Sequence, residues 1–103
     1  MSNSKNIAKN PQLWVRIVSP KKTIFEGAAL SLSSTNTRGP FDILPFHANF
    51  ITLIEAKPIL IRQEGKKIVS FTFPIAIIYT REDRIDIYTD IHISDQFREL
   101  EKV

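Results

Sequence analysis

The stretch that decides the fold runs from Gly39 to Thr52 and reads GPFDILPFHANFIT. Two short apolar runs, residues 41–44 and 50–53, lie on either side of Pro45. Proline fixes its own φ angle and has no backbone N–H to donate, so a central strand cannot continue through Pro45. The sequence therefore predicts that the chain turns a corner here, between two strands. Because the corner is rich in aromatic residues, it indicates either a hinge in the core or a presented contact surface.

Alternation of apolar and polar side chains predicts short strands along most of the chain. The clearest example is residues 85–92, whose polar face carries Asp86 and Asp90 and is expected to meet water or a polar partner. A strand over residues 23–26 is expected to end at Gly27. Residues 28–34 are expected to form a strand with Leu30 and Leu32 on one side. The strand over residues 75–79 is expected to be buried on both faces. Five aromatic residues at strand spacings are interpreted as core residues: Trp14, Phe25, Phe71, Phe73 and Tyr79.

The fold class that follows is all-β, a β-sandwich or flattened barrel of about ten strands. Residues 13–93 form the predicted sandwich domain. Residues 1–12 are polar and are expected to be a disordered tail. Residues 94–103 are expected to form a short helical stub, because Ser94 can cap a helix that carries an aspartate in its first turn.

Composition excludes several kinds of chemistry. The chain of 103 residues has no cysteine and three glycines, so it offers no disulfide, no thiolate ligand and no glycine-rich phosphate loop. His47 and His92 are the candidates for general-base work near neutral pH, and neither lies at a recognisable catalytic spacing from a serine or an acid. Asp86 and Asp90 share a strand face about 13 Å apart, too far to chelate one cation. We expect a binding or structural module, not an enzyme, with no cofactor and no metal.

The charge balance points to no particular partner. The net charge is +3 and the pI is about 9.4, but the lysines and arginines are scattered, so charge alone does not favour a nucleic-acid surface. The first eleven residues lack the apolar core of a signal peptide, and no apolar run approaches the roughly twenty residues of a membrane helix. We therefore expect a soluble protein that does not insert into a membrane.

Taken in order, the chain resembles the N-terminal β-sandwich of the epsilon subunit of F-type ATP synthases. The resemblance covers residues 13–93 and includes VRIVSP at 15–20 and IFEG at 24–27. Its strongest part is residues 39–52, where G-x-F-x-I-L-P-x-H-A-x-x-x-T is similar to the family's G-x-[FL]-G-I-L-P-G-H-A-P-x-x-T.

The departures from the family pattern lie in the same stretch. Asp42 and Phe46 occupy positions where the family has glycine, and Asn49 occupies a proline position. A residue other than glycine predicts that the backbone avoids a positive φ or that strain is tolerated, and Phe46 is the least expected of the three. Family members also continue into a two-helix hairpin that restrains ATP hydrolysis in many bacteria. Only residues 95–103 remain here, so neither that inhibition nor the ATP binding attributed to the hairpin is expected.

The resemblance implies a non-catalytic rotor subunit in the central stalk, without a cofactor, which links the gamma subunit to the membrane c-ring and so couples proton- or sodium-driven rotation to ATP synthesis. The implied location is peripheral, on the cytoplasmic face of a bacterial plasma membrane, as part of the F1 sector, with the stromal side of a thylakoid membrane as the organellar alternative. By analogy the c-ring contact comprises Arg38, Gly39, Pro40, Phe41, Phe46 and His47. The structural corner behind it comprises Ile43, Leu44, Pro45 and Ala48, of which Ile43 and Leu44 are expected to be buried.

Two alternatives stay open at this point. One is a stand-alone β-sandwich that binds a peptide or glycan with Trp14 as the anchor, and burial of Trp14 would count against it. The other is an OB-like binder of single-stranded nucleic acid, which the pI favours and which strongly salt-dependent binding would support.

Overall fold

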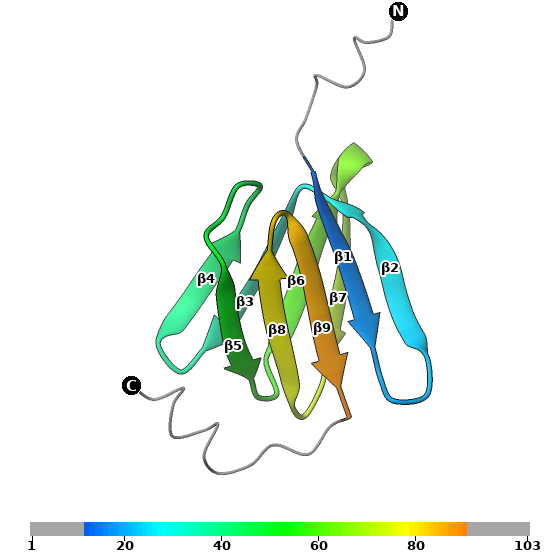
Figure 1. Cartoon of the computed structure of the whole chain (residues 1–103), viewed down its shortest axis with the longest axis vertical. Helices are drawn as coiled ribbons and strands as arrows, with labels where there is room; N and C mark the ends of the chain where they lie inside the picture. The colour runs from blue at the N-terminus through cyan, green and yellow to red at the C-terminus, as the bar shows by residue number, and fades with distance from the viewer. Residues whose placement is uncertain (1–11, 91–103) are drawn as a thin grey trace, which may run out of the picture.

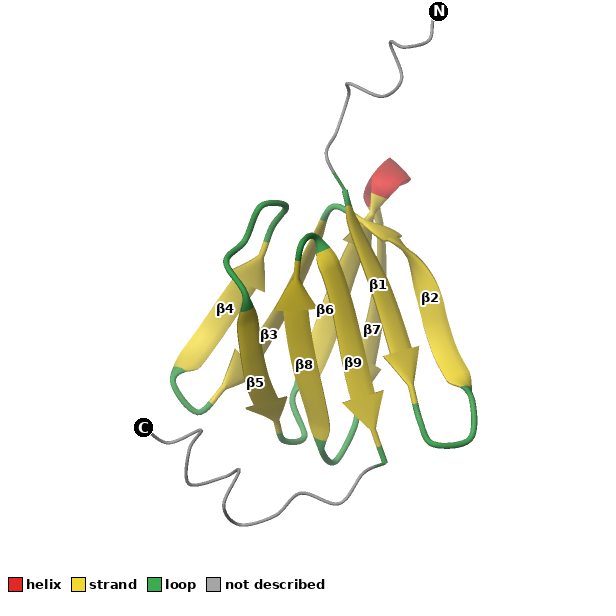
Figure 2. Cartoon of the chain, viewed as in Figure 1, coloured by secondary structure: helices red, strands yellow, loops and turns green. Residues whose placement is uncertain are grey.

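The computed structural model describes residues 12–90, which form two packed β-sheets (Figures 1 and 2). An all-β sandwich is therefore confirmed. The predicted polar tail, apart from Gln12, and the predicted helical stub lie outside the described residues. Within residues 12–90 the elements are nine strands and one 3₁₀ turn: β1 (Leu13–Val18), β2 (Thr23–Ala29), β3 (Ser31–Asn36), β4 (Gly39–Ile43), β5 (Phe50–Ile54), β6 (Pro58–Gln63), η1 (Glu64–Lys66), β7 (Lys67–Thr72), β8 (Ala76–Arg81) and β9 (Arg84–Thr89).

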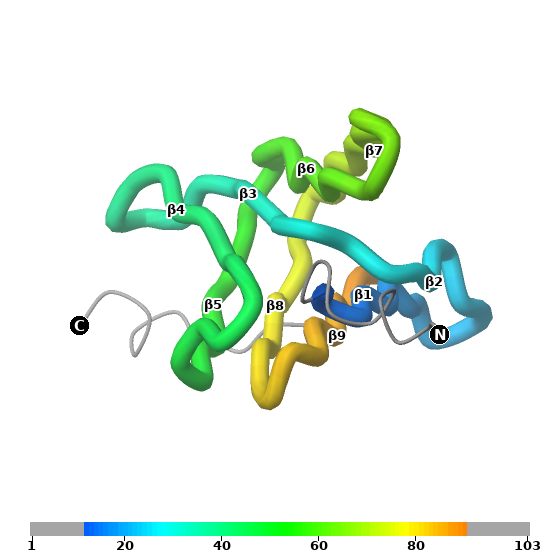
Figure 3. Tube along the Cα trace, turned by 90° about the horizontal axis from the view of Figure 1, so that it is seen from above, coloured from blue at the N-terminus to red at the C-terminus, as the bar shows by residue number. Residues whose placement is uncertain are grey.

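One sheet has five strands in the order β2-β1-β9-β8-β5, and the other has four in the order β4-β3-β6-β7. Figure 3 shows the two layers from above. β1 pairs with β9 in parallel, with Val15 opposite Ile85, while the other strand pairs are antiparallel. The corner at Pro45 lies between β4 and β5, which belong to different sheets. The chain therefore passes from one layer to the other at the predicted corner.

The core lies between the sheets because each strand turns alternate side chains inward. In β1 and β9 the inward positions include Ile17 and Ile87, which face each other in the register and are fully buried. Burying one side chain of this size contributes about 1.5–3 kcal/mol. The buried core cluster is Leu13, Val15, Ile17, Ala29, Leu32, Ile43, Ile54, Ile59, Ile61, Ala76, Ile78, Ile85 and Ile87.

Three expectations about strands were wrong. β2 continues through Gly27 to Ala29. A side chain at Gly27 would meet Gln63 Nε2 at 3.3 Å, so this glycine admits a close neighbour and does not end the strand. A bend at Leu30 separates β2 from β3, so both Ser31 and Leu32 are buried in place of a simple alternation.

The third concerns β8, which is buried on one face only. Its inward side chains, such as Ile78, are buried, whereas Ile77 and Tyr79 on the other face are half-buried. The guanidinium of Arg81 lies over the Tyr79 ring, 5.3 Å from the centroid. Tyr79 is therefore an outer-face residue and not part of the core cluster.

The outer face of the five-stranded sheet bears on two more expectations. Asp86 was expected to meet water or a polar partner, and it meets a polar partner: its carboxylate is 9% exposed and pairs with the Arg16 guanidinium, Nε to Oδ1, at 3.4 Å. The interpretation of Trp14 as a core residue was wrong. Trp14 is 40% exposed, and its indole N–H donates to Glu26 Oε2 at 2.9 Å. Phe25, Phe71 and Phe73 do pack against the core as expected.

Candidate functional site

The corner after β4 is a tight turn from Leu44 to His47. The His47 backbone N–H donates to the Leu44 carbonyl oxygen at 3.1 Å, and Pro45 and Phe46 occupy the two central positions. Phe46 has a φ of 69°. Proline at the first central position with a positive φ at the second is the pattern of a type II turn, whose second central residue is usually glycine. The family pattern also has glycine at this position. Phe46 replaces that glycine and still adopts the positive φ of a type II turn.

Phe46 is strained and exposed at the same time. A left-handed backbone conformation costs a bulky residue roughly 1–2 kcal/mol. The side chain recovers nothing from burial within residues 12–90, since it is 80% exposed. The sequence allowed two outcomes at this position: a backbone that avoids a positive φ, or a positive φ with tolerated strain. The second is observed.

Asp83 holds the corner in place. Its carboxylate oxygen Oδ1 accepts the Phe46 backbone N–H at 2.7 Å, across 37 positions in the sequence. Its own backbone oxygen accepts the Trp14 N–H at 2.9 Å, at the start of β1. Asp83 and Glu82 form the two-residue turn between β8 and β9, with φ angles of 60° and 50°. One residue therefore ties the corner, this hairpin and the first strand together.

The predicted structural corner is only partly correct. Ile43 is fully buried, as expected. Leu44 was expected to be buried and is 55% exposed, because it follows Ile43 in the pleat and points to the opposite side. Pro45 is half-buried and Ala48 is exposed. Leu44 therefore belongs with Phe46 on the exposed surface of the turn.

His47 and Phe41 face inward toward Phe50. The His47 ring lies edge-on to Phe50 with centroids 5.6 Å apart, and Phe41 lies edge-on to the same ring at 5.3 Å. His47 Nδ1 is 2.7 Å from the Ala48 carbonyl oxygen, which accepts a hydrogen bond from the Nδ1–H. Both residues shape the base of the corner and are half-buried, whereas Phe46 extends outward.

The rest of the predicted contact lies at the other end of β4. Arg38 belongs to the β3–β4 turn and Gly39 begins β4, and Figure 1 shows this turn at the opposite end of the strand from the β4–β5 corner. Pro40 and Leu44 are separated by about 14 Å at the usual strand rise. The structure therefore does not gather the six predicted residues into one cluster. The exposed residues Pro40, Asp42 and Leu44 form a row along edge strand β4 that connects the two ends.

Asp42 fits its position without strain. It lies within β4 opposite Ser33 of β3 and is not among the residues with a positive φ. The Ser33 hydroxyl donates to Asp42 Oδ1, and the Arg62 guanidinium donates to the Ser33 oxygen at 3.0 Å. A side chain in place of the family's glycine is accommodated here by a polar network on the outer face of the sheet.

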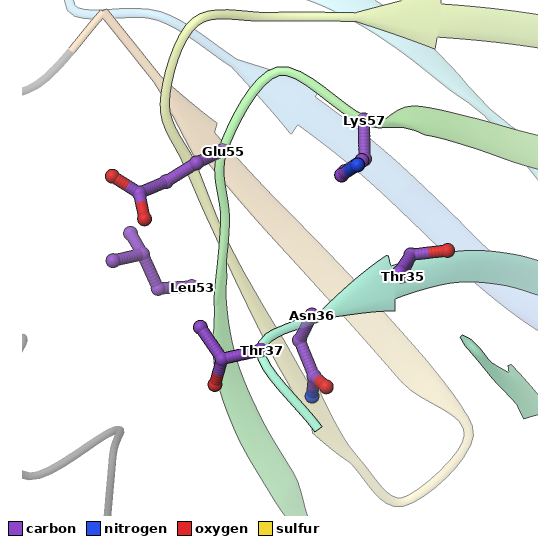
Figure 4. A pocket seen from close by; sticks show the side chains of 6 residues that line it. All are labelled: Thr35, Asn36, Thr37, Leu53, Glu55 and Lys57. Atoms are coloured by element: carbon purple, nitrogen blue, oxygen red, sulfur yellow. The ribbon is translucent and has the colours of Figure 1, made fainter. Parts of the chain in front are cut away.

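The described part of the chain offers no metal-binding cluster and one small cavity near the predicted contact. No group of three or more His, Asp or Glu residues within residues 12–90 could hold a metal ion. A small open cavity of about 140 Å³ lies beside the β3–β4 turn (Figure 4). Ligand pockets for small molecules are usually 300–1,000 Å³, so this cavity is too small for most of them. Its lining residues are Thr35, Asn36, Thr37, Leu53, Glu55 and Lys57.

A family match covers most of the chain. Residues 12–94 match the family described as ATP synthase, Delta/Epsilon chain, beta-sandwich domain. The chain belongs to this family. The resemblance read from the motif at residues 39–52 is thereby confirmed.

Individual relatives agree with the family match. Over 79 residues the chain is 29% identical to the ATP synthase epsilon chain of Sulfurimonas denitrificans and 24% identical to that of Brevibacillus brevis. These alignments cover 77% of this chain and 61% and 60% of the relatives. The chain therefore matches about three-fifths of the length of these epsilon chains.

The fold also recurs in solved ATP synthases. A chain in the OSCP/F1/c-ring structure of the Euglena gracilis mitochondrial ATP synthase matches with a TM-score of 0.70 at 13% identity, covering 99% of this chain and 76% of that one. A chain in the central stalk/c-ring structure of the Tetrahymena thermophila enzyme matches with a TM-score of 0.62, also at 13% identity, covering 80% and 66%. At this identity the likeness shows a shared fold.

Sequence reasoning missed Asp83. An aspartate in a charged turn has no distinctive sequence signal, because its bond to Phe46 depends on how two distant turns meet. The family's glycine at position 46 was the available hint, since it indicated that the backbone there has a positive φ and needs support.

Proposed function

We propose that this protein is a non-catalytic rotor subunit of an F-type ATP synthase, which joins the gamma subunit to the membrane c-ring. The observation that carries the proposal is the match of residues 12–94 to the β-sandwich domain of ATP synthase delta and epsilon chains. The protein then resides peripherally at the membrane, on the cytoplasmic face in a bacterium, as part of the F1 sector. No helix within residues 12–90 is long and apolar enough to cross a membrane.

The architecture suits transmission of torque. Both sheets turn their apolar sides onto one core, and close-packed interiors have low compressibility and transmit strain. A link between ring and shaft needs this stiffness and needs no catalytic group. Coupling of proton- or sodium-driven rotation to ATP synthesis is the role that follows.

The c-ring contact in this proposal runs along the exposed side of β4. It begins at Arg38 and Pro40, passes Asp42 and Leu44, and ends at Phe46. His47 and Phe41 act from behind this surface, through their packing on Phe50. The gamma subunit binds elsewhere on the sandwich, so that one rigid body joins both partners.

Charge reversal tests this placement. We expect Arg38→Glu to weaken co-purification with the c-ring more than Lys66→Glu does, because a c-ring loop that meets Arg38 should present neutral or acidic residues. Lys66 is a suitable control because it is an exposed cation in η1, on the β6–β7 hairpin. Equal effects would refute the placement of the contact on β4. A wild-type chain that retains neither gamma nor c-ring would refute the rotor function itself.

The rival modules have less support. Trp14 is exposed and could anchor a ligand, but its indole N–H is already bonded to Glu26. The phenylalanines that could stack on nucleic-acid bases are packed against one another instead, with Phe25 edge-on to Phe71 and Phe71 stacked on Phe73.

A further inference from the structure

The geometry of Phe46 is unusual because two unfavourable features coincide. Its φ of 69° is disfavoured for a bulky side chain, and its ring is 80% exposed. Glycine would remove the strain and the exposed ring at once. An exposed aromatic residue in a strained conformation therefore contributes little to folding, and backbone strain of this kind concentrates at functional surfaces.

The strained turn is also held in one position. The Phe46 N–H donates to Asp83 Oδ1 at 2.7 Å, and the Asp83 carbonyl oxygen accepts from the Trp14 N–H at the start of β1, an interior strand of the larger sheet. On the inner side, His47 packs on Phe50. The ring of Phe46 thus projects from a backbone that is fixed from two sides. A fixed group loses less conformational freedom on binding, so it binds more tightly than a mobile one.

The surroundings of Phe46 favour a protein pocket over a lipid surface. Leu44 in the same turn is 55% exposed and extends the apolar area. The charged side chains around the two turns have both signs: Asp42 and Glu82 are negative, and Arg81 and Arg84 are positive. An anionic membrane attracts clustered cations, which these turns lack. Buried aromatic anchors, in contrast, dominate the energy of protein–protein interfaces.

We propose that Phe46 is a preorganised anchor that inserts into an apolar pocket on the c-ring surface, and that Asp83 is the positioning residue that holds it ready. This inference rests on the proposed rotor function and specifies how one of its two contacts is made. Phe46 supplies the buried ring, Leu44 covers its edge, and Asp83 fixes the turn without contacting the partner.

The first test replaces Phe46 with glycine in the full chain. Phe46→Gly should raise the melting temperature by about 4 °C, because the strain is relieved. It should weaken binding to the detergent-solubilised c-ring by about thirtyfold, the usual loss for an interface hot spot. Binding to the isolated gamma subunit should not change. Ile68→Ala is the matched control, since it truncates another exposed apolar side chain, on β7, and should leave c-ring binding unchanged.

The second test separates the positioning role of Asp83 from general damage to the hairpin. Asp83→Gly and Glu82→Gly each place glycine at a positive φ in the same turn, but only the first removes the acceptor for Phe46. Asp83→Gly should speed amide hydrogen exchange at Phe46 and weaken c-ring binding several-fold. Glu82→Gly should do neither. Asp83→Asn keeps an oxygen acceptor and should restore both properties.

The outcomes distinguish the anchor from the rotor function. If Phe46→Gly binds the c-ring as tightly as the wild type, the anchor is refuted and the rotor function stands. If Phe46→Gly lowers the melting temperature, the argument from strain is refuted. If the variant loses binding only to vesicles of phosphatidylglycerol and phosphatidylethanolamine, the partner is lipid and the pocket is refuted. If the wild type binds neither c-ring nor gamma subunit, both proposals fail.

Discussion

The two turns at the ends of β4 each require a residue with a positive φ, and they meet this requirement in different ways. The turn before the strand has Gly39 at a φ of 121°, with nothing within 4 Å of where a side chain would start. It is held locally, since the Asn36 side chain accepts from the Arg38 N–H at 2.8 Å. The turn after the strand has Phe46 at a φ of 69° and is held by Asp83 from a distant hairpin.

This difference distinguishes a residue that only satisfies the backbone conformation from one that also presents a side chain at the surface. Glycine at position 39 meets a backbone requirement and presents nothing to a partner. Phenylalanine at position 46 meets a similar requirement at an energetic cost and presents a ring. Where a chain keeps a costly residue and adds a distant hydrogen bond to support it, the exposed side chain is the feature to test for function.

The largest expected effect is on stability, and it distinguishes two neighbouring residues at the second turn. Ile43→Ala should destabilise the protein by about 3 kcal/mol, because it leaves a cavity in the core. Leu44→Ala should change the stability by less than about 0.5 kcal/mol, because that side chain is 55% exposed. Urea unfolding of both variants measures the contrast. Similar losses for the two would show that Leu44 is buried and would remove it from the contact surface.

A smaller effect tests the glycine of the first turn. Gly39→Ala should cost about 2 kcal/mol, because a φ of 121° lies outside the left-handed region that other residues can enter. Gly65→Ala is the control, with a φ of 78° and equally open space, and should cost about 1 kcal/mol. Thermal and urea unfolding give both values. If Gly39→Ala proves the milder change, the turn before β4 can relax and the comparison between the two turns weakens.

The smallest effect concerns the local support of the first turn. Asn36→Ala removes the acceptor for Arg38 and the bond from Asn36 Nδ2 to Thr52 Oγ1 at 3.0 Å. We expect a loss of about 1 kcal/mol in the free energy of unfolding. Thr37→Ala, in the same turn and exposed, should be nearly neutral. A neutral Asn36→Ala would mean that the turn is fixed by Gly39 alone.

Sequence reasoning predicted the parts of the fold that depend on local pattern. Alternation predicted the strand at β9, and the missing N–H of Pro45 predicted the corner that carries the chain between the sheets. The motif at residues 39–52 predicted the family. Each of these inferences uses neighbouring residues, whose influence on the backbone is direct.

The details that sequence reasoning did not predict depend on contacts between strands and on the length of β4. Asp86 is buried because the parallel register places Arg16 directly across from it, 70 positions away in the sequence. Leu44 was expected inside because it extends an apolar run, but the pleat of β4 turns it outward after Ile43. The contact residues were expected together by analogy with the family, whereas the extended strand β4 separates them.

The parallel pairing of β1 and β9 has a consequence for biosynthesis. β1 lies between β2 and β9, so among the described strands one edge of β1 has no partner until β9 has been synthesised. Pairings so distant in sequence form slowly. While the chain is still on the ribosome, the backbone N–H and C=O groups along the free edge of β1 have no strand to pair with. An unpaired strand edge can associate with other chains. Fusions that delay release of residues 84–89 from the ribosome should therefore lower the soluble yield.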